Sequence, residues 1–338
     1  MRSRIFGHTG LVVTEVGLGG SPLGNRSREI SEQQSEAIIE SAWDLGVRYF
    51  DTAPLYGHGL AEARLGHGLR WKPREDFVVS SKVGRILEPA PRHSVDYGPW
   101  TSGLAFKCRY DYSYDGARRA LEDSIQRMGI ERIEIALIHD VDVFTHGDTQ
   151  PDMFREAMNG AYRALIALRE QGVVKAIGIG VNEWEPCYEA LRMGDFDCFL
   201  LAGRYTLLEQ EPLDTFLPLC EQRGAAVIIG GGFNSGILAT GSGARARYNY
   251  GPPSAEILAK VRRIEFACAR HEVPLAAAAH QFILAHPAVV SHIPGARTPE
   301  QVRQNVAWAT YAIPGQFWDE LRRDGLLRAD APIPRGSA

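Results

Sequence analysis

The sequence predicts an α/β fold in which eight parallel strands and eight helices close into a (β/α)8 TIM barrel. Short apolar segments alternate with amphipathic segments eight times along the chain, and this alternation indicates a parallel sheet. Most of the apolar segments are rich in β-branched residues, as parallel strands covered on both faces should be. An open, doubly wound sheet would need Gly-x-Gly-x-x-Gly after an early strand. Pro22 and Glu183 occupy the third-glycine positions of the two candidate motifs, so the barrel is favoured.

The first third of the chain carries the opening elements of this barrel. Residues 5–13 alternate loosely between apolar and polar, which predicts a small N-terminal hairpin. Ser31 is placed to cap a helix that runs to Leu45, with Gln34 in capping-box register. We further expect strands at 15–20, 47–50 and 77–81, and a helix at 61–69. Residues 84–112 hold prolines, glycines and aromatic residues without a sustained period, so we expect a long, ordered lid there.

The remainder of the chain continues the alternation and fits one domain over residues 1–338, because barrels reach this length. The expected strands are 133–138, 173–180, 196–201, 225–229 and 289–293. The expected helices are 115–128, 152–169, 183–193, 212–222, 254–270, 274–285, 299–308 and 314–321. Two further loops, at 140–151 and 230–253, follow strands. They are expected at the carboxyl ends of those strands, where barrel enzymes place their active sites.

Composition excludes several classes of protein. The net charge is −4 and no polybasic run is present, so no nucleic-acid partner is indicated. No apolar stretch has the length of a signal peptide or a membrane span. Five dispersed cysteines without a Cys-x-x-Cys pair fit a reducing, cytoplasmic location. The expected partner is a small-molecule substrate, and the sequence carries no signal for an oligomeric state.

Titratable residues follow three neighbouring strands at the points where these strands end. Asp51, Lys82 and His139 come directly after apolar runs, and Tyr56 lies on the loop after Asp51. Each residue alone is typical of an ordinary strand end, but in a barrel all would meet at one mouth. A tyrosine ionises near pH 10, and a nearby ammonium lowers its pKa. A tyrosine tuned in this way serves as a general acid or base for hydride transfer.

Three motifs resemble those of the aldo-keto reductase family: DTAPLYG at 51–57, SSKVG at 80–84 and LIHD at 137–140. The resemblance covers roughly residues 4–325. It implies an aldo-keto reductase type of barrel, with an N-terminal hairpin and long loops on the carboxyl-terminal face. It also implies Asp51, Tyr56, Lys82 and His139 as catalytic residues. The family binds an extended nicotinamide dinucleotide without a Rossmann motif.

The same resemblance implies a set of cofactor-binding residues. These are Gly20, Asn182, Gly231, Gly232, Phe233, Ser235, Gly295, Arg297, Gln301, Gln304 and Asn305. Gly230 stands where many relatives have an aromatic residue that stacks on the nicotinamide ring. Relatives that prefer NADP often carry a lysine near position 295 and an arginine near 301, and both are missing. We therefore expect NAD, or use of both cofactors, with Arg297 as a partial substitute because guanidinium binds phosphate well.

Finer features resemble the aldose 1-dehydrogenases that act on L-fucose, L-galactose and D-arabinose, with pyridoxal 4-dehydrogenase similar in pattern. They lie at 111–116, 139–142, 180–184 and 202–208. The implied reaction is oxidation of the sugar at C1 to a lactone. Trp100, Trp184 and Arg204 are candidate substrate contacts.

Three other functions remain open. The first is reduction of another small aldehyde or ketone. The second is metal-dependent hydrolysis, since His139, Asp140, Asp142, His146 and Asp148 are residue types that bind metals. Most of them lie on one loop, whereas hydrolase ligands come from several strands, so no metal site is expected. The third is a non-enzymatic subunit that senses the nicotinamide state.

Overall fold

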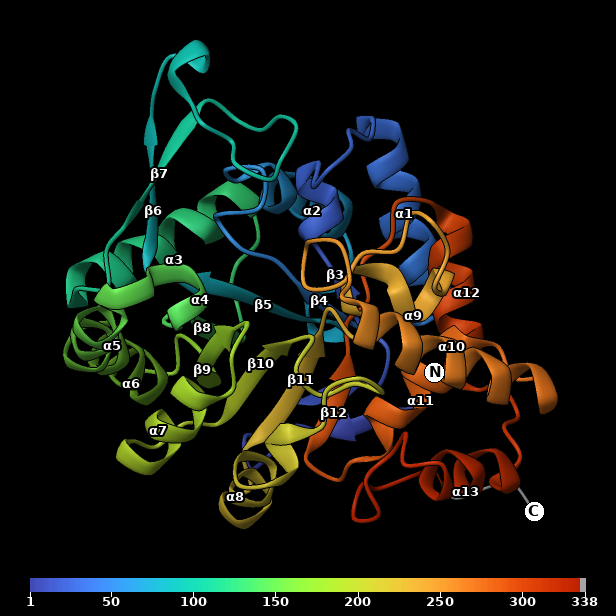
Figure 1. Cartoon of the computed structure of the whole chain (residues 1–338). Helices are drawn as coiled ribbons and strands as arrows, with labels where there is room; N and C mark the ends of the chain where they lie inside the picture. Colours follow the sequence, from blue (N-terminus) through green and yellow to red (C-terminus); the bar gives the residue numbers. More distant parts are fainter. Residues whose placement is uncertain (335–338) are drawn as a thin grey trace.

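Eight parallel strands form the centre of the molecule in a computed structural model that describes residues 1–334 (Figure 1). Their order is β12-β11-β10-β9-β8-β5-β4-β3. Their bounds are β3 (Leu18–Gly19), β4 (Tyr49–Asp51), β5 (Val78–Val83), β8 (Ile135–His139), β9 (Ala176–Val181), β10 (Cys198–Ala202), β11 (Ala226–Gly230) and β12 (Val289–His292). Parallel bridges from Val16 to His292 and from Gly19 to Gly295 join the two edges of the sheet. The predicted barrel is therefore confirmed.

A short hairpin covers the end of the barrel at which the strands begin. Strands β1 (Ser3–Ile5) and β2 (Val12–Thr14) pair antiparallel, as the sequence predicts. Phe6, Leu11 and Val13 of this segment are buried in one apolar cluster with the first residues of several barrel strands, such as Ile135 and Ala226. Because this end is filled with apolar side chains, polar chemistry is left to the opposite end.

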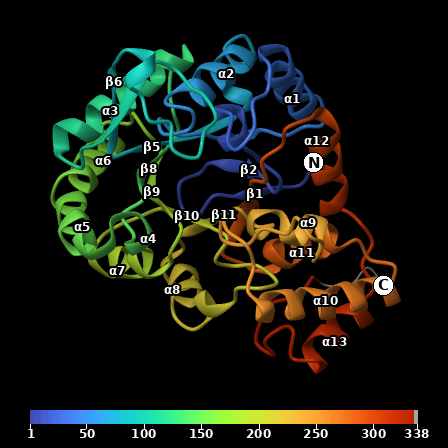
Figure 2. The ribbon, with the colours of Figure 1, turned by 45° about the horizontal axis from the view of Figure 1, so that its top comes forward.

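Helices surround the strands as a ring, which Figure 2 shows from a tilted direction. The longer ones are α1 (Glu32–Asp44), α2 (Leu60–Leu69), α3 (Tyr114–Met128), α5 (Gln150–Asn159), α6 (Ala161–Glu170), α7 (Glu185–Met193), α8 (Phe216–Arg223), α10 (Ala255–Arg270), α11 (Leu275–Ala285), α12 (Pro299–Ala309) and α13 (Gly315–Arg323). The shorter ones are α4 (Val143–His146), α9 (Ile237–Thr240), and the 3-10 turns η1 (Ser21–Gly24), η2 (Arg74–Asp76), η3 (Arg92–Ser94), η4 (Gly147–Thr149), η5 (Glu211–Leu213) and η6 (Asn234–Gly236). Ser31 caps α1 by accepting the Gln34 amide at 3.1 Å. The Gln34 side chain donates to Arg297 O at 2.6 Å rather than completing a capping box.

The prediction for residues 84–112 was wrong in one respect. The segment contains an antiparallel hairpin, β6 (Arg85–Pro89) and β7 (Phe106–Tyr110), that projects beyond the barrel (Figure 1). The first three residues of β6 are all buried and the last two are exposed. No alternation of period two was therefore visible in the sequence.

Two other sequence expectations also need correction. The predicted helix at 152–169 is two helices, α5 and α6, because the chain bends at Gly160. At the bend the Ala161 amide donates to the Tyr112 carbonyl oxygen at 2.8 Å. A Cβ on Gly160 would lie 2.4 Å from the same oxygen, so this position requires glycine. The predicted loop at 140–151 holds the short helix α4, which Asp142 caps by accepting the Thr145 amide at 3.1 Å.

Candidate active site

The mouth of the barrel is built around a buried ion pair between Lys82 of β5 and Asp51 of β4. Lys82 Nζ donates to both carboxylate oxygens of Asp51 at 2.9 Å and to the Thr52 carbonyl oxygen at 2.8 Å. Ser80 Oγ adds a hydrogen bond to Asp51 Oδ1 at 2.7 Å. Burial alone lowers the pKa of Lys82, but Asp51 and Tyr56 outweigh it, and the net pKa is raised. Lys82 is therefore a fixed cation.

Tyr56 lies above this pair, on the loop between β4 and α2. Lys82 Nζ is 5.0 Å from the centroid of the Tyr56 ring. The ring stacks on Trp100 at 6.0 Å and meets His139 edge-on, also at 6.0 Å. Burial raises the pKa of Tyr56 to about 12, and Lys82 lowers it only in part. We expected Lys82 to lower the pKa of Tyr56 below its ordinary value. Lys82 does lower this pKa, but burial raises it by more, so the expected net decrease was wrong.

His139 ends β8 and is almost fully buried. Burial lowers the pKa of its imidazole well below the ordinary value, and Arg85 and Lys82 lower it further. His139 is therefore neutral at physiological pH. Its Nε2 lies 3.4 Å from Asp140 Oδ2. Within residues 1–334, its buried Nδ1 has no hydrogen-bond partner.

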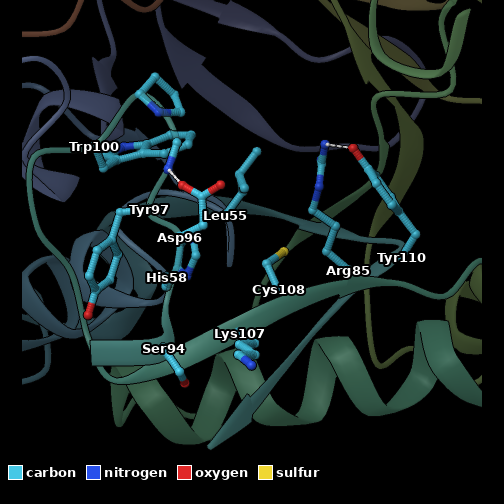
Figure 3. A pocket seen from close by; sticks show the side chains of 12 residues that line it. Leu55, His58, Arg85, Ser94, Asp96, Tyr97, Trp100, Lys107, Cys108 and Tyr110 are labelled. Atoms are coloured by element: carbon cyan, nitrogen blue, oxygen red, sulfur yellow. Dashed lines mark hydrogen bonds between the residues drawn. The ribbon is translucent and has the colours of Figure 1, made fainter. Parts of the chain in front are cut away.

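One of the three candidate substrate residues, Trp100, lines a pocket next to the loop that carries Tyr56, although none of the four catalytic residues is among the described residues that line it. Trp100 is 5% exposed and forms one wall of a pocket of about 390 Å³ under the β6–β7 hairpin. Figure 3 shows Trp100 and Tyr97 on one side of this pocket and Arg85 and Tyr110 on the other. Leu55, next to Tyr56 in the chain, also lines the pocket.

The other two candidate substrate residues have different surroundings. Trp184 meets Tyr188 of α7 edge-on at 6.4 Å and packs against the core. Arg204 Nη2 donates at 3.1 Å to Oδ1 of Asn249, which lies on the loop between α9 and α10. Neither residue is among those that line the pocket in the described chain.

Several predicted cofactor residues line the rim between β3 and β12. The Gly20 amide donates to Asp51 O at 2.7 Å, and a Cβ at this position would lie 2.6 Å from the same oxygen. Gly295 bridges to Gly19. A Cβ at Gly295 would lie 2.5 Å from the Pro22 side chain. Both glycines are therefore needed for close packing of the protein's own chain beside Asp51.

The loop after β11 is ordered by contacts with its neighbours. Gly231 has a positive φ of 57°, and His292 lies directly beneath Gly232. Phe233 points inward and meets the rings of His292 and Trp308 edge-on, at 5.2 and 5.8 Å. This ring is therefore part of the core packing. Ser235 Oγ accepts the Tyr250 amide at 2.8 Å.

Asn182, at the end of β9, is covered by a tyrosine that sequence reasoning missed. The Tyr250 hydroxyl donates to Asn182 Oδ1 at 2.9 Å. The ring of Tyr250 lies 4.7 Å from the Arg26 guanidinium. Tyr250 follows Asn249 in a polar stretch without periodicity, so no sequence pattern indicates this contact.

Arginine side chains gather where the adenosine end of a dinucleotide is expected. Arg297 Nη2 donates to Arg26 O at 3.0 Å, and the Arg297 amide donates to Gln301 Oε1 at 2.7 Å. Burial lowers the pKa of Arg297, and the charges of Arg28 and Arg26 lower it further. Within residues 1–334 no carboxylate forms an ion pair with these arginines. Of the other predicted contacts here, Gln304 is exposed and Asn305 is buried.

Unpartnered polar atoms test whether the site fits an anionic dinucleotide. Thr52 Oγ1 and Arg297 Nε are buried and have no hydrogen-bond partner in the described chain. The first lies beside Gly20 and the second lies within the arginine group. Unused polar atoms and unpaired cations are what the phosphates and ribose of such a cofactor require, so the residues present fit it.

Comparison with known proteins gives the family. The model of the aldo/keto reductase family matches residues 15–323. The chain belongs to the aldo/keto reductase family. Pyridoxal 4-dehydrogenase of Microbacterium luteolum is 46% identical over 335 residues, covering 96% of this chain and 97% of the relative. D-threo-aldose 1-dehydrogenase of a Pseudomonas species is 38% identical and covers 94% of this chain and 96% of the relative. In fold, the chain is similar to the glycerol dehydrogenase AKR11B4 from Gluconobacter oxydans, with a TM-score of 0.74, 22% identity and coverage of 99% and 98%.

This aldo/keto reductase is accordingly an NAD(P)-dependent oxidoreductase that acts on a small molecule. Among residues 1–334 no group of three or more histidine, cysteine, aspartate or glutamate side chains is placed to hold a metal ion. Asp140 instead pairs with Arg85 at 2.9 Å, and Asp142 accepts the Asn182 amide at 2.7 Å. No helix in this part of the chain has the length and apolar character needed to span a bilayer.

Proposed function

We propose that this enzyme oxidises the hydroxyl-bearing carbon of a cyclic hemiacetal to a lactone. The observation that carries the proposal is the fixed Lys82 cation 5.0 Å from the Tyr56 ring, with the neutral His139 on another side of the same ring. Aldoses and pyridoxal both suit this chemistry. Each is an aldehyde that carries a hydroxyl group, and addition of that hydroxyl to the aldehyde carbon forms a cyclic hemiacetal. The two classes named by the relatives thus present the same reacting group.

Three residues have separate roles in this oxidation: Tyr56, Lys82 and His139. Tyr56 in its phenolate form takes the hydroxyl proton, and Lys82 stabilises that phenolate. His139 donates a hydrogen bond to the same substrate oxygen and holds it in place. As the O–H bond breaks, the carbon–oxygen double bond forms and the carbon loses hydrogen with its electron pair. A bound oxidised nicotinamide would supply the hydride acceptor and one positive charge at the mouth.

Two substrate classes are proposed, an aldose such as L-fucose, L-galactose or D-arabinose, and pyridoxal. Pyridoxal is favoured by one feature of the site, because Trp100, Tyr97 and Tyr110 give the pocket aromatic walls for a flat ring. The higher identity of the relative named for pyridoxal points the same way. Sugars also pack on aromatic faces through their C–H groups, so the aldose remains the second candidate.

For the cofactor, we propose that Asn182 holds the nicotinamide carboxamide and that Tyr250, its partner at 2.9 Å, covers the ring in place of the missing stacking residue. A 2′-phosphate would bind to the group formed by Arg297, Arg28 and Arg26. NADP is therefore proposed as a second cofactor beside NAD. Replacing Arg297 by methionine is expected to weaken NADP+ binding by about tenfold or more, since a charge-assisted bond contributes roughly 1.5–3 kcal/mol. NAD+ binding should change little. Fluorescence titration with both cofactors measures this, and equal losses for both would contradict the assignment.

The test of the function is an NAD+-reduction screen with L-fucose, L-galactose, D-arabinose, D-galactose and pyridoxal, run with and without a chelator. Tyr56→Phe should retain cofactor binding in a fluorescence titration and lose most turnover, because the proton acceptor is gone. Retained turnover would remove Tyr56 from its role. Cofactor binding without turnover of any substrate would favour a sensing subunit, and chelator-sensitive activity would favour a metal enzyme.

A further inference from the structure

A second buried ion pair lies against His139, outside the four catalytic residues. Arg85 Nη1 is 2.9 Å from Asp140 Oδ2, and the same carboxylate oxygen is 3.4 Å from His139 Nε2. The Arg85 and Asp140 side chains are 4% and 12% exposed. At this burial their charges are screened less than those of exposed side chains, so both act on the nearby imidazole.

The backbone fixes the position of Asp140. Its φ is 50°, a left-handed conformation that only a few per cent of non-glycine residues adopt, with aspartate among the more tolerant. The Tyr112 hydroxyl lies 2.7 Å from the His139 carbonyl oxygen and 3.0 Å from that of Asp140. The Asp140 amide donates to Gly180 O at 2.9 Å. Hydrogen bonds from Tyr112 and to Gly180 therefore hold the turn that places the Asp140 carboxylate beside the His139 imidazole.

The hairpin that sequence reasoning missed fixes the position of Arg85. Arg85 pairs with Tyr110 across β6 and β7. Its Nη2 lies 3.1 Å from the Tyr110 hydroxyl, and its guanidinium lies 4.7 Å from the centre of the Tyr110 ring. Burial raises the pKa of the Asp140 carboxyl, and Arg85 offsets this rise only in part. Arg85 therefore stays next to Asp140 and is the cation that favours its ionised form.

This charge decides which imidazole nitrogen of His139 carries the hydrogen. A lone pair on Nε2 would face a carboxylate oxygen at 3.4 Å and be repelled, whereas an N–H group there is attracted. A hydrogen on Nδ1 would be buried, and the described chain offers it no acceptor, which is costly. Both effects favour hydrogen on Nε2. At 3.4 Å that hydrogen is not committed to Asp140 and is available to a substrate oxygen.

We infer that Asp140 and Arg85 are positioning residues that hold His139 in the tautomer with hydrogen on Nε2, so that it donates to the reacting oxygen. This inference rests on the proposed role of His139. The pair acts through His139. Because Arg85 also lines the pocket proposed for the substrate, the effect of its variants on His139 is measured as kcat rather than KM.

Asp140→Asn tests the inference because it keeps the side-chain size and removes the charge. We expect kcat to fall on the order of 10- to 100-fold, the range found for groups that orient metal-bound imidazoles, with cofactor affinity unchanged. The matched control is Glu88→Gln, since Glu88 pairs with Arg109 at 3.0 Å on the outer part of the same hairpin. Its kcat should remain that of the wild type.

The Arg85 variants give a second measurement. Arg85→Lys should keep most of the activity, because it keeps a cation, and Arg85→Met should lose activity to a similar degree as Asp140→Asn. The double variant Arg85→Met with Asp140→Asn should be no slower than Asp140→Asn alone, because both changes act through one imidazole. Fully additive losses, or a wild-type kcat in Asp140→Asn, would overturn the inference.

Nitrogen NMR of the His139 ring reads the tautomer without any turnover. In the wild-type enzyme we expect hydrogen on Nε2, and in Asp140→Asn a loss of this preference. Hydrogen on Nδ1 in the wild type, or an unchanged spectrum in the variant, would refute the inference. Because this measurement does not depend on the substrate, its failure is distinguishable from failure of the proposed reaction, which Tyr56→Phe tests.

Discussion

Replacement of Lys82 by methionine isolates the contribution of the buried cation to catalysis. Lys82 Nζ lies 5.0 Å from the Tyr56 ring centroid. At an effective dielectric constant of about 20, two unit charges at this separation interact by about 3 kcal/mol, which corresponds to about 2 pKa units. Burial already raises the pKa of Tyr56 to about 12, so near neutrality the phenolate is the minor form. Removing the cation should reduce the phenolate fraction, and with it kcat/KM, by about 100-fold.

The assay is kcat/KM for oxidation across the neutral and alkaline range. Because Tyr56 must lose a proton to act as a base, log kcat/KM should rise with pH with a slope near one in both enzymes. The line of the variant should lie about two log units below that of the wild type. Coinciding lines would refute the coupling between Lys82 and Tyr56. A slope of zero in the wild type would refute the high pKa of Tyr56.

A control is needed because Lys82→Met leaves Asp51 charged and only 3% exposed. Breaking a buried pair in this way costs roughly 3–5 kcal/mol of stability. The double variant Asp51→Asn with Lys82→Met removes both charges and should melt closer to the wild type. Asp51 raises the pKa of Tyr56, so the double variant should also be faster than Lys82→Met alone. If it is slower, the electrostatic explanation is wrong.

Two further predictions concern the pocket and the packing. Trp100→Ala removes an aromatic wall of the pocket and should raise substrate KM on the order of 10-fold, because a ring stacked on the substrate would contribute about 1 kcal/mol beyond the area it buries. Trp71→Ala, at an 88% exposed site, is the control and should leave KM unchanged. Equal KM values for the two variants in steady-state kinetics would contradict the assignment. Gly66→Ala in α2 would place a Cβ 2.0 Å from Met128 O of α3 and should destabilise the fold by about 1–3 kcal/mol. Gly315→Ala is the control, because a Cβ at this position has open space. Thermal denaturation compares the two variants. Similar melting temperatures would show that α2 and α3 can move apart without loss of stability.

The strand-end residues were predictable because parallel strands in a barrel end at one face. Asp51, Lys82 and His139 each follow an apolar run, and that pattern survives in the sequence as a short motif. Their neighbours in space were not predictable in the same way. Arg85 reaches Asp140 only because the β6–β7 register places it beside Tyr110. Tyr250 reaches Asn182 from 68 residues away. Contacts of this kind depend on how loops fold over the mouth, and periodicity carries no information about that.

The pKa of Tyr56 shows a different reason for the limits of the sequence. The residue types alone place a phenol near an ammonium, which predicts a lowered pKa. Burial raises the pKa of the same phenol, and this larger effect is set by how Trp100, His139 and the rest of the mouth pack around it. A sequence can therefore indicate the sign of a pairwise interaction but not the sum that includes burial. The fraction of Tyr56 that is ionised during catalysis depends on the positive charges at the mouth of the barrel. Lys82 supplies such a charge next to the Tyr56 ring. This is why the pH profile of Lys82→Met, rather than the presence of the motif, decides how the site functions.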